Sequence, residues 1–197
     1  FDGSWVALRS ALVFMKVETM IQQRKYMPAR HLLLNLVELL RYNKGGKDQE
    51  KKTLIWFQVR DKLAEIGERQ ARWKDAIIVS TQGLGETSVT RCSMWTRRFS
   101  FRRAYSYYQM GDFENCMNDI QTVCTSFEEQ NFTDGLYLRS LALKAAIVMD
   151  FAASDINGLS GPLRDVQGCI EGLEKARRVA ERMCAVAGHL GADSNVT

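Results

Sequence analysis

The 197-residue sequence has only two prolines, Pro28 and Pro162, and hardly any segment in which apolar and polar residues alternate strictly. An all-β sandwich or barrel of this length would need more turn residues and more alternation. Apolar residues instead recur at intervals of three and four, which is the period of an amphipathic helix. We therefore expect an all-α protein.

Long hydrophobic runs are also missing. The longest apolar stretch, residues 136 to 153, is interrupted by Arg139, Lys144 and Asp150, whereas a membrane-spanning helix needs roughly 20 predominantly apolar residues. No signal peptide opens the sequence, and the first residue, Phe1, suggests a fragment of a longer protein. We expect a cytoplasmic protein with no direct membrane insertion, peripheral at most to membranes of the secretory pathway.

Residue patterns typical of enzymes are scarce. His31 and His189 are the only histidines, and the sequence has no HExxH motif, no Cys and His at zinc-ligand spacing and no Gly-x-Ser-x-Gly elbow. Residues 83 to 88 superficially resemble a phosphate-binding loop, but they follow a helical pattern and lack the Walker lysine. We expect no catalytic residue, no metal and no cofactor.

Net charge and cysteine content point to no specialised class. Lys and Arg exceed Asp and Glu by only +4, less than dedicated nucleic-acid-binding domains usually show. The odd number of cysteines without a CxxC pair favours buried free thiols in a reducing compartment over a disulfide framework. The five cysteines, all but the first inside apolar helical patterns, are Cys92, Cys116, Cys124, Cys169 and Cys184.

The periodicity predicts eight helices. Glycine and polar residues mark three longer connections, which we expect to be exposed, mobile insertions at 43 to 52, 83 to 91 and 154 to 161. The predicted helices are residues 4 to 24, 27 to 42, 49 to 69, 72 to 82, 93 to 110, 113 to 130, 134 to 152 and 162 to 188.

The segment from 104 to 123 has small residues, a glycine and aromatics at regular positions. The pattern resembles the tetratricopeptide repeat, in which small residues let two helices touch, glycine makes the turn and an aromatic packs beneath it. Glu128 stands where the family has its closing proline. The matching positions are Ala104, Tyr107, Gly111, Phe113 and Cys116.

Partial copies of this pattern surround Arg24 and Ala71, so that equivalent turns fall at 24, 71, 111 and 161. A generic helical bundle would share the helical period but not the recurring small and aromatic positions. The resemblance implies one domain over 1 to 197, a right-handed α-solenoid of hairpins at about 4 to 42, 49 to 82, 93 to 130 and 134 to 188. The copied positions are Tyr26, Ala29, Ala64, Trp73 and Ala76.

Residues 26 to 124, including the run from Leu54 to Arg60, also resemble the tetratricopeptide subunit of the TRAPP vesicle-tethering complexes. That resemblance implies a non-catalytic scaffold for protein–protein interaction, a subunit of an assembly in vesicle-mediated transport. Its partners would be other protein subunits, which would dock a helix or an extended peptide.

In tetratricopeptide hairpins the first helix of each pair lines a concave groove. The second repeat places largely acidic residues there, whereas the third places arginines and aromatics that suit a protein interface. Alternatively, these aromatics pack only against the neighbouring repeat. The candidate partner-binding residues are Arg97, Arg98, Phe101, Arg102, Tyr105, Tyr108 and Gln109, and the acidic set is Asp61, Glu65 and Glu68 beside Gln58 and Arg69.

The arginines between 91 and 103 allow a second function. They could form a solvated helix face, contact an acidic protein, or contact an RNA backbone. An RNA-binding helical-repeat protein is therefore the alternative to the protein scaffold, although the mild net charge disfavours nucleic acid as a partner.

Overall fold

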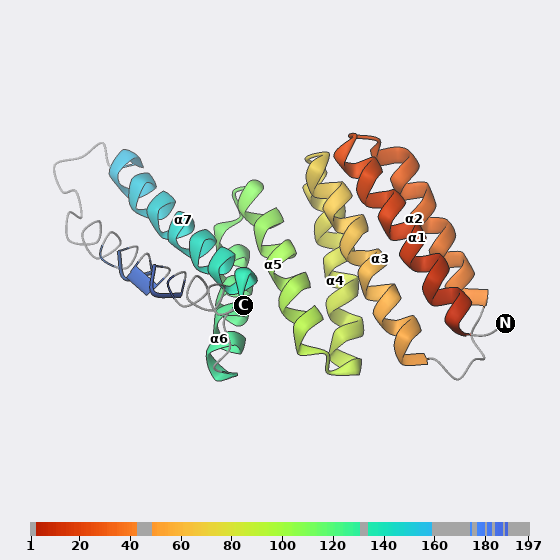
Figure 1. The fold of residues 1–197 in the computed structure, drawn as a ribbon. Helices are drawn as coiled ribbons and strands as arrows, with labels where there is room; N and C mark the ends of the chain where they lie inside the picture. Colours follow the sequence, from red (N-terminus) through yellow and green to blue (C-terminus); the bar gives the residue numbers. More distant parts are fainter. Residues whose placement is uncertain are drawn as a thin grey trace. The chain divides into compact units, whose positions relative to one another are not determined.

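In the computed structural model the protein is built from α-helices (Figure 1). The structure describes residues 3–42, 49–130 and 134–158, with short helical pieces between 174 and 188, and no strand occurs within them. The all-α prediction is therefore confirmed. The helices are α1 (Gly3–Gln22), α2 (Tyr26–Tyr42), α3 (Gln49–Arg69), α4 (Trp73–Thr90), α5 (Ser93–Gln109), α6 (Phe113–Glu129) and α7 (Gly135–Gly158).

The chain divides into two compact units, residues 1–106 and 107–197, with the boundary inside α5. The first unit contains α1 to α4 and most of α5, and the second contains the end of α5 with α6 and α7. In an array of stacked hairpins each hairpin contacts only its neighbours, so such units are expected in one repeat domain as well. The single-domain boundaries stay a prediction.

Three tight turns share one backbone geometry. The backbones of Arg24, Ala71 and Gly111 adopt the left-handed conformation, with φ of 58°, 54° and 75°. The backbone N–H of the residue that follows each of them donates a hydrogen bond to the carbonyl five positions before it. This hydrogen bond ends many helices. These turns lie where the repeat pattern predicted them. The donor and acceptor pairs are Lys25–Met20 at 2.8 Å, Arg72–Gly67 at 2.8 Å and Asp112–Tyr107 at 3.0 Å.

The small residues predicted at the helix contacts of the first three hairpins are buried. In the second hairpin, a Cβ added to Gly67 would stand 3.4 Å from the Ala76 Cβ, so the two helices are in close contact there. The aromatics Tyr26, Trp73 and Phe113 each begin the second helix after a turn. The small residues with no exposed surface are Ala29, Ala64, Ala76, Ala104 and Cys116.

The core of the first unit changes character along the chain. Around α1, α2 and the start of α3 it is aliphatic, with Val17, Leu33 and Val59 fully buried. Between α3 and α5 it is aromatic, because Phe57 packs against Trp95 and Phe99 with ring centroids 5.8 and 6.1 Å apart. This aromatic group holds α5 against α3.

The prediction of an exposed connector at 83 to 91 is wrong, because α4 continues to Thr90. Gly83 is buried, and its missing side chain leaves room for the Phe99 ring, which would lie 2.7 Å from an added Cβ. Thr87 is also buried, and its hydroxyl donates to the Leu84 carbonyl at 3.1 Å. The glycine therefore permits close helix packing instead of making a turn.

Two other predicted connections are shorter than expected. α3 begins at Gln49, inside the connection predicted at 43 to 52, of which residues 43–48 lie outside the described residues. α7 extends to Gly158, so part of the connection predicted at 154 to 161 is helical. The eighth helix, predicted at 162 to 188, is described only in pieces, which are helical.

Candidate functional site

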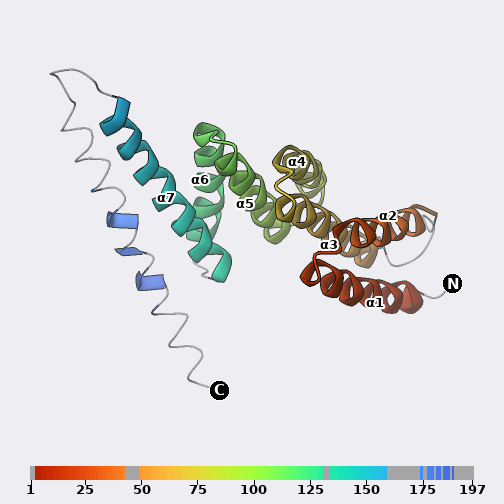
Figure 2. The same cartoon turned by 90° about the horizontal axis from the view of Figure 1, so that it is seen from above.

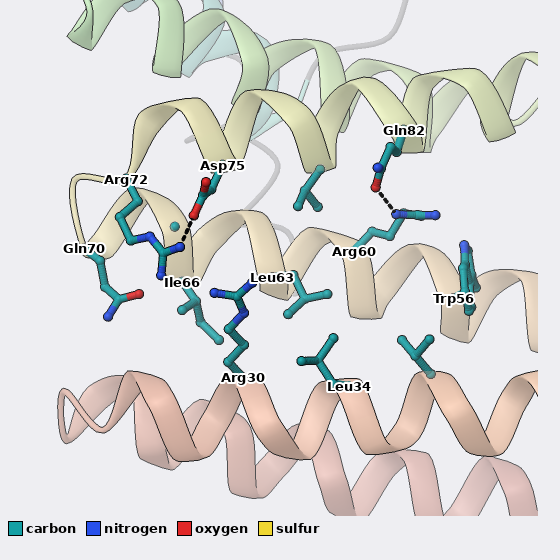
Figure 3. Close-up of a pocket in the computed structure, with 13 residues that line it drawn as sticks. Arg30, Leu34, Trp56, Arg60, Leu63, Ile66, Gln70, Arg72, Asp75 and Gln82 are labelled. Atoms are coloured by element: carbon teal, nitrogen blue, oxygen red, sulfur yellow. Dashed lines mark hydrogen bonds and ion pairs between the residues drawn. The ribbon is translucent and has the colours of Figure 1, made fainter.

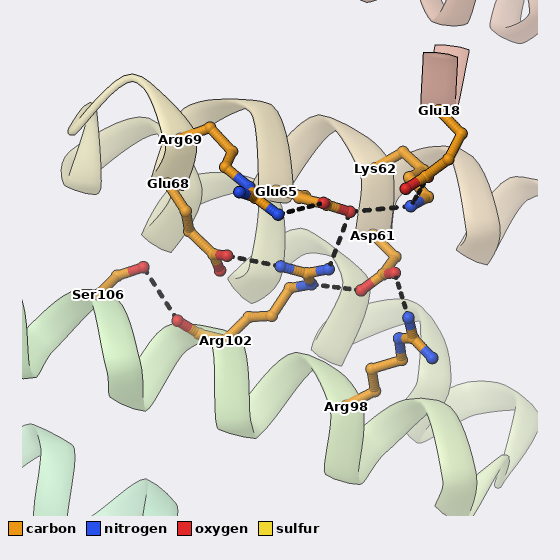
Figure 4. Close-up of polar contacts among 9 residues, drawn as sticks. All are labelled: Glu18, Asp61, Lys62, Glu65, Glu68, Arg69, Arg98, Arg102 and Ser106. Carbon is orange, nitrogen blue, oxygen red and sulfur yellow. Dashed lines mark hydrogen bonds and ion pairs between the residues drawn. The ribbon is translucent and has the colours of Figure 1, made fainter. Parts of the chain in front are cut away.

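A network of charged side chains joins α1, α3 and α5 in the first unit (Figure 4). Its carboxylates come from α1 and α3, and its two guanidinium groups nearest the centre come from α5. We call it the charge ladder. Its members are Glu18, Asp61, Lys62, Glu65, Glu68, Arg69, Arg98 and Arg102.

Helical spacing explains why these charges meet. Asp61, Glu65 and Glu68 are four and three residues apart and share one face of α3. Arg98 and Arg102 are four residues apart and share one face of α5. Since the aromatic core group holds α5 against α3, the basic face of one helix lies over the acidic face of the other.

Arg102 is the centre of the ladder. Its Nε donates to Asp61, its Nη1 donates to Glu68 at 2.6 Å, and its Nη2 lies 3.6 Å from Glu65. The second oxygen of Asp61 lies 2.9 Å from Arg98 Nη2. The Asp61 carboxylate, with only 3% of its side chain exposed, is therefore compensated by two cations.

Lysine extends the ladder to the first helix. Lys62 Nζ donates to Glu65 at 2.9 Å and also to Glu18 of α1. Arg69, at 3.7 Å from Glu65, lies at the edge and is largely exposed. The three alternate helices α1, α3 and α5, each the first of its predicted hairpin, thus contribute to one polar surface.

The two buried carboxyl groups differ electrostatically. Burial opposes ionisation of Asp61, but Arg102 and Arg98 outweigh it and hold its pKa below the usual value. Burial raises the pKa of Glu68 to about 7, and the effect of Arg102 is partly cancelled by the negative Asp61 and Glu65. Glu68 Oε1 is buried and accepts no hydrogen bond. The Glu68 end of the ladder is therefore the less well compensated one.

Only some of the arginines and aromatics predicted to bind a partner have exposed side chains. Arg97 and Phe101 are buried, so neither presents a side chain on the surface of the unit. Arg102 is held inside the ladder, while Arg98 pairs with Asp61 and keeps 48% of its side chain exposed. Of these four residues, Arg98 offers the most accessible charge.

Both predicted tyrosines have contacts inside their own unit. In the first unit, Tyr105 meets Trp73 edge-on, with centroids 6.0 Å apart. In the second, Tyr108 packs on Phe113 with centroids 5.9 Å apart and donates its hydroxyl to Asp150 at 2.8 Å. The alternative in which the aromatics pack internally explains these contacts. Gln109 is exposed, and partner binding by any of these residues stays a prediction.

A separate pocket of about 340 Å³ lies between α2, α3 and α4 (Figure 3). Arg60 and Arg72 line it, but Arg60 donates to Glu86 at 2.6 Å and Arg72 pairs with Asp75. Much of the remaining wall is aliphatic, and Figure 3 shows no nucleophile beside a base. Asp75, the carboxylate among the lining residues, is held in its ion pair with Arg72.

Cysteine burial agrees with the prediction in part. Cys116 and Cys124 are buried free thiols, and burial raises their pKa to about 12 and about 11. Cys184 is exposed, so the expectation of burial is wrong for it, and Cys169 lies outside the described residues. Helical periodicity shows which residues share a face of a helix, but it does not show whether another element covers that face.

Among the residues that the structure describes, no three His, Cys, Asp or Glu side chains gather in a way that could hold a metal ion. None of the helices described is both long and apolar enough to cross a bilayer. The sequence matches no protein-family model and no curated protein.

The sequence did not predict that the ladder residues pair with one another, although most of them, all but Glu18 and Lys62, were predicted to line the groove. Asp61 and Arg102 lie on the first helices of two different predicted repeats, and the expectation was a groove of mixed charge with no pairing between them. A usable signal was present, because a row of acids on one helix and a row of arginines on the next are complementary. Opposite charges at matching repeat positions therefore predict a contact between repeats.

Proposed function

We propose that this protein is a non-catalytic helical-repeat scaffold that binds other protein subunits over the charge ladder. The observation that carries the proposal is the continuity of ion pairs across α1, α3 and α5. Because inner pairs fix the side chains, the ladder presents a preorganised pattern of both charges. A partner helix or extended peptide with complementary charges suits such a surface.

The outer members of the ladder are the groups that a partner would reach. Glu18, Arg69 and Arg98 have 45%, 61% and 48% of their side chains exposed. Charges at such positions mainly steer association and set specificity, whereas the buried members hold the scaffold together. The geometry therefore supports recognition of a protein surface of mixed charge.

RNA binding has no observation in its favour among the described residues. Arg97 is buried, and Arg102 is engaged by Asp61, Glu65 and Glu68. A phosphate backbone approaching this face would therefore meet carboxylates as well as arginines, and the electrostatic gain would be small.

The resemblance of residues 26 to 124 to the TRAPP subunit supports a more specific version of this proposal. In it, the protein is a cytoplasmic subunit of a tethering assembly, and it reaches secretory-pathway membranes through its partners. The repeated turns at Arg24, Ala71 and Gly111 agree with the hairpins that this resemblance requires.

Affinity isolation with quantitative mass spectrometry tests the proposal. One variant removes the exposed ladder charges, and a control variant removes one acid and two lysines from exposed positions outside the ladder. We expect the wild type and the control to retain the same partner proteins and the ladder variant to lose them. The ladder variant is Glu18→Ala, Arg69→Ala, Arg98→Ala, and the control is Lys25→Ala, Lys74→Ala, Glu114→Ala.

Two results would contradict the scaffold proposal. Partners that remain bound to the folded ladder variant would exclude this surface as the binding site. Release of the partners by ribonuclease would instead favour the RNA-binding alternative.

A further inference from the structure

The outer face of α1 carries a stripe of apolar side chains that no described helix covers. Leu8, Leu12 and Met15 are 55%, 55% and 60% exposed, and their spacing places them on one face of the helix. Figure 2 shows α2 and α3 on the same side of α1. A row of exposed apolar side chains on one helix differs from scattered surface leucines, because it offers a continuous contact area.

The shared turn geometry shows which residues of the later repeats correspond to this stripe. The turns at Arg24, Ala71 and Gly111 are 47 and 40 residues apart. Applying these intervals, Leu8 corresponds to Ile55 of α3 and Trp95 of α5, and Leu12 corresponds to Val59 and Phe99. All four corresponding residues are buried.

In the second and third predicted repeats the preceding hairpin covers the residues that correspond to Leu8 and Leu12, whereas Met15 corresponds to Lys62 and Arg102 of the charge ladder. Ile55 and Val59 of α3 belong to one core cluster with Leu33, Leu36 and Leu40 of α2. Phe99 of α5 lies against Gly83 of α4. In this chain, therefore, the stripe of a first helix packs on the second helix of the hairpin before it.

Contact positions on the two covering helices are also equivalent. On α2 they are Leu33, Leu36 and Leu40, and an interval of 47 leads to the buried Ser80, Gly83 and Thr87 of α4. Leucines cover the aliphatic stripe of α3, whereas small residues occur opposite the aromatic stripe of α5. Since the α1 stripe is aliphatic, a covering helix with leucine-sized residues at these positions fits it best.

Charges beside the stripe specify the covering helix further. Arg9 and Lys16 are exposed on one flank, and neither forms an ion pair within the described residues. Lys16 corresponds to Arg103 of α5, which donates to Thr81 of the covering helix α4 at 3.3 Å. A covering helix with carboxylates on that flank is therefore complementary, while pairing of two identical α1 stripes would bring cations together.

We propose that the α1 stripe binds the second helix of a helical hairpin in another protein subunit. That helix carries leucine-sized residues at i, i+3 and i+7 and carboxylates on the flank that faces Arg9 and Lys16. Glu18, the member of the charge ladder on α1, lies on the flank of the stripe opposite to Lys16, so this surface does not use the charge ladder. The inference therefore goes beyond the function proposed above.

A display library of helical hairpins tests the inference with a defined probe. The second helix of each hairpin is randomised at its outward positions and selected on the purified 197-residue chain. We expect selected hairpins to contain aliphatic residues at i, i+3 and i+7 with Asp or Glu beside them. The variant Leu8→Glu, Leu12→Glu should weaken their binding at least about tenfold, because two apolar anchors are lost.

Matched variants distinguish binding at this stripe from non-specific hydrophobic binding and from the effects of misfolding. Ile78→Glu changes another exposed apolar residue of the first unit and should leave binding unchanged. Arg9→Glu, Lys16→Glu leaves every apolar residue in place and should weaken the selected acidic hairpins several-fold. Circular dichroism checks that each variant is folded.

Four outcomes would overturn the inference. The first is a library without enriched hairpins, and the second is hairpins that bind the Leu8→Glu, Leu12→Glu variant as well as the wild type. The third is self-association of the chain that this variant abolishes, which would assign the stripe to a second copy. The fourth is binding by this chain but not by a longer form of the protein, which would assign the stripe to a segment of the same protein.

Discussion

The contact between Gly83 and Phe99 makes a quantitative prediction about packing. A Cβ added at residue 83 would stand 2.7 to 2.8 Å from three atoms of the Phe99 ring, whereas carbon atoms in contact are about 3.5 to 4.0 Å apart. The ring cannot easily move, because it is fully buried and its centroid lies 5.8 Å from that of Trp95. Gly83→Ala therefore forces atoms of the core to shift.

Two opposing terms decide the sign of the effect. Overpacking a core typically costs about 1 to 3 kcal/mol, and replacing glycine by alanine inside a helix gains about 1 kcal/mol. Since the overlap with the Phe99 ring is close to an ångström, we expect the upper part of the first range. The Gly83→Ala variant should be destabilised by roughly 1 to 2 kcal/mol.

Gly85 provides the matched control on the same helix. A Cβ at Gly85 meets nothing within 4 Å, so Gly85→Ala should stabilise the protein by up to about 1 kcal/mol through helix propensity alone. Urea denaturation followed by circular dichroism compares the two variants. Adding Phe99→Leu should reduce the penalty of Gly83→Ala, because the two residues are in contact.

Either of two results would refute this reasoning. If Gly83→Ala stabilises the protein as much as Gly85→Ala, the Phe99 ring does not occupy the space beside Gly83. If neither substitution changes the free energy of unfolding, residues 83 to 91 form the flexible connector expected from the sequence.

The remaining predictions concern pH, hairpin packing and thiol reactivity. Because the folded-state pKa of Glu68 is raised from 4.5 to about 7, its contribution to stability is fully present below pH 4.5 and lost as the pH rises through 7. Glu68→Gln should abolish that loss in urea titrations over this range, and parallel profiles of the two proteins would be evidence against it. Ala76→Leu should lower stability by roughly 1 to 3 kcal/mol, and an unchanged thermal melt would show that the hairpin contact is misplaced. Iodoacetamide should label the exposed Cys184 well before Cys116 and Cys124, as followed by mass spectrometry, and equal rates would contradict their burial.

Hairpin turns were predictable because their signal is local. Ala71 lies between a small residue on one helix and Trp73 at the start of the next, and the same arrangement surrounds Gly111. A few neighbouring residues determine such a turn, so neither a distant contact nor a related sequence is needed to find it. This explains why even Arg24, a residue that rarely adopts positive φ, was placed correctly.

What the sequence did not predict depends on contacts between distant residues. Two glycines close together at 83 and 85 usually indicate a break, and only the aromatic ring of Phe99 shows that one of them serves close packing. The link between Asp61 and Arg102 joins residues 41 positions apart. Propensity and periodicity report the state of a segment but not which face of another segment it meets.

The rule by which each hairpin packs on the one before it also sets an order of assembly during synthesis. As the chain leaves the ribosome, α1 and α2 can close around the turn at Arg24 before the next helix exists, and α3 can then lay its stripe on a finished surface. Contacts made in this order are short in sequence, which favours fast folding. Each growing intermediate would thus expose the second helix of its newest hairpin until the next first helix covers it, whereas none of the described helices ever covers the stripe of α1.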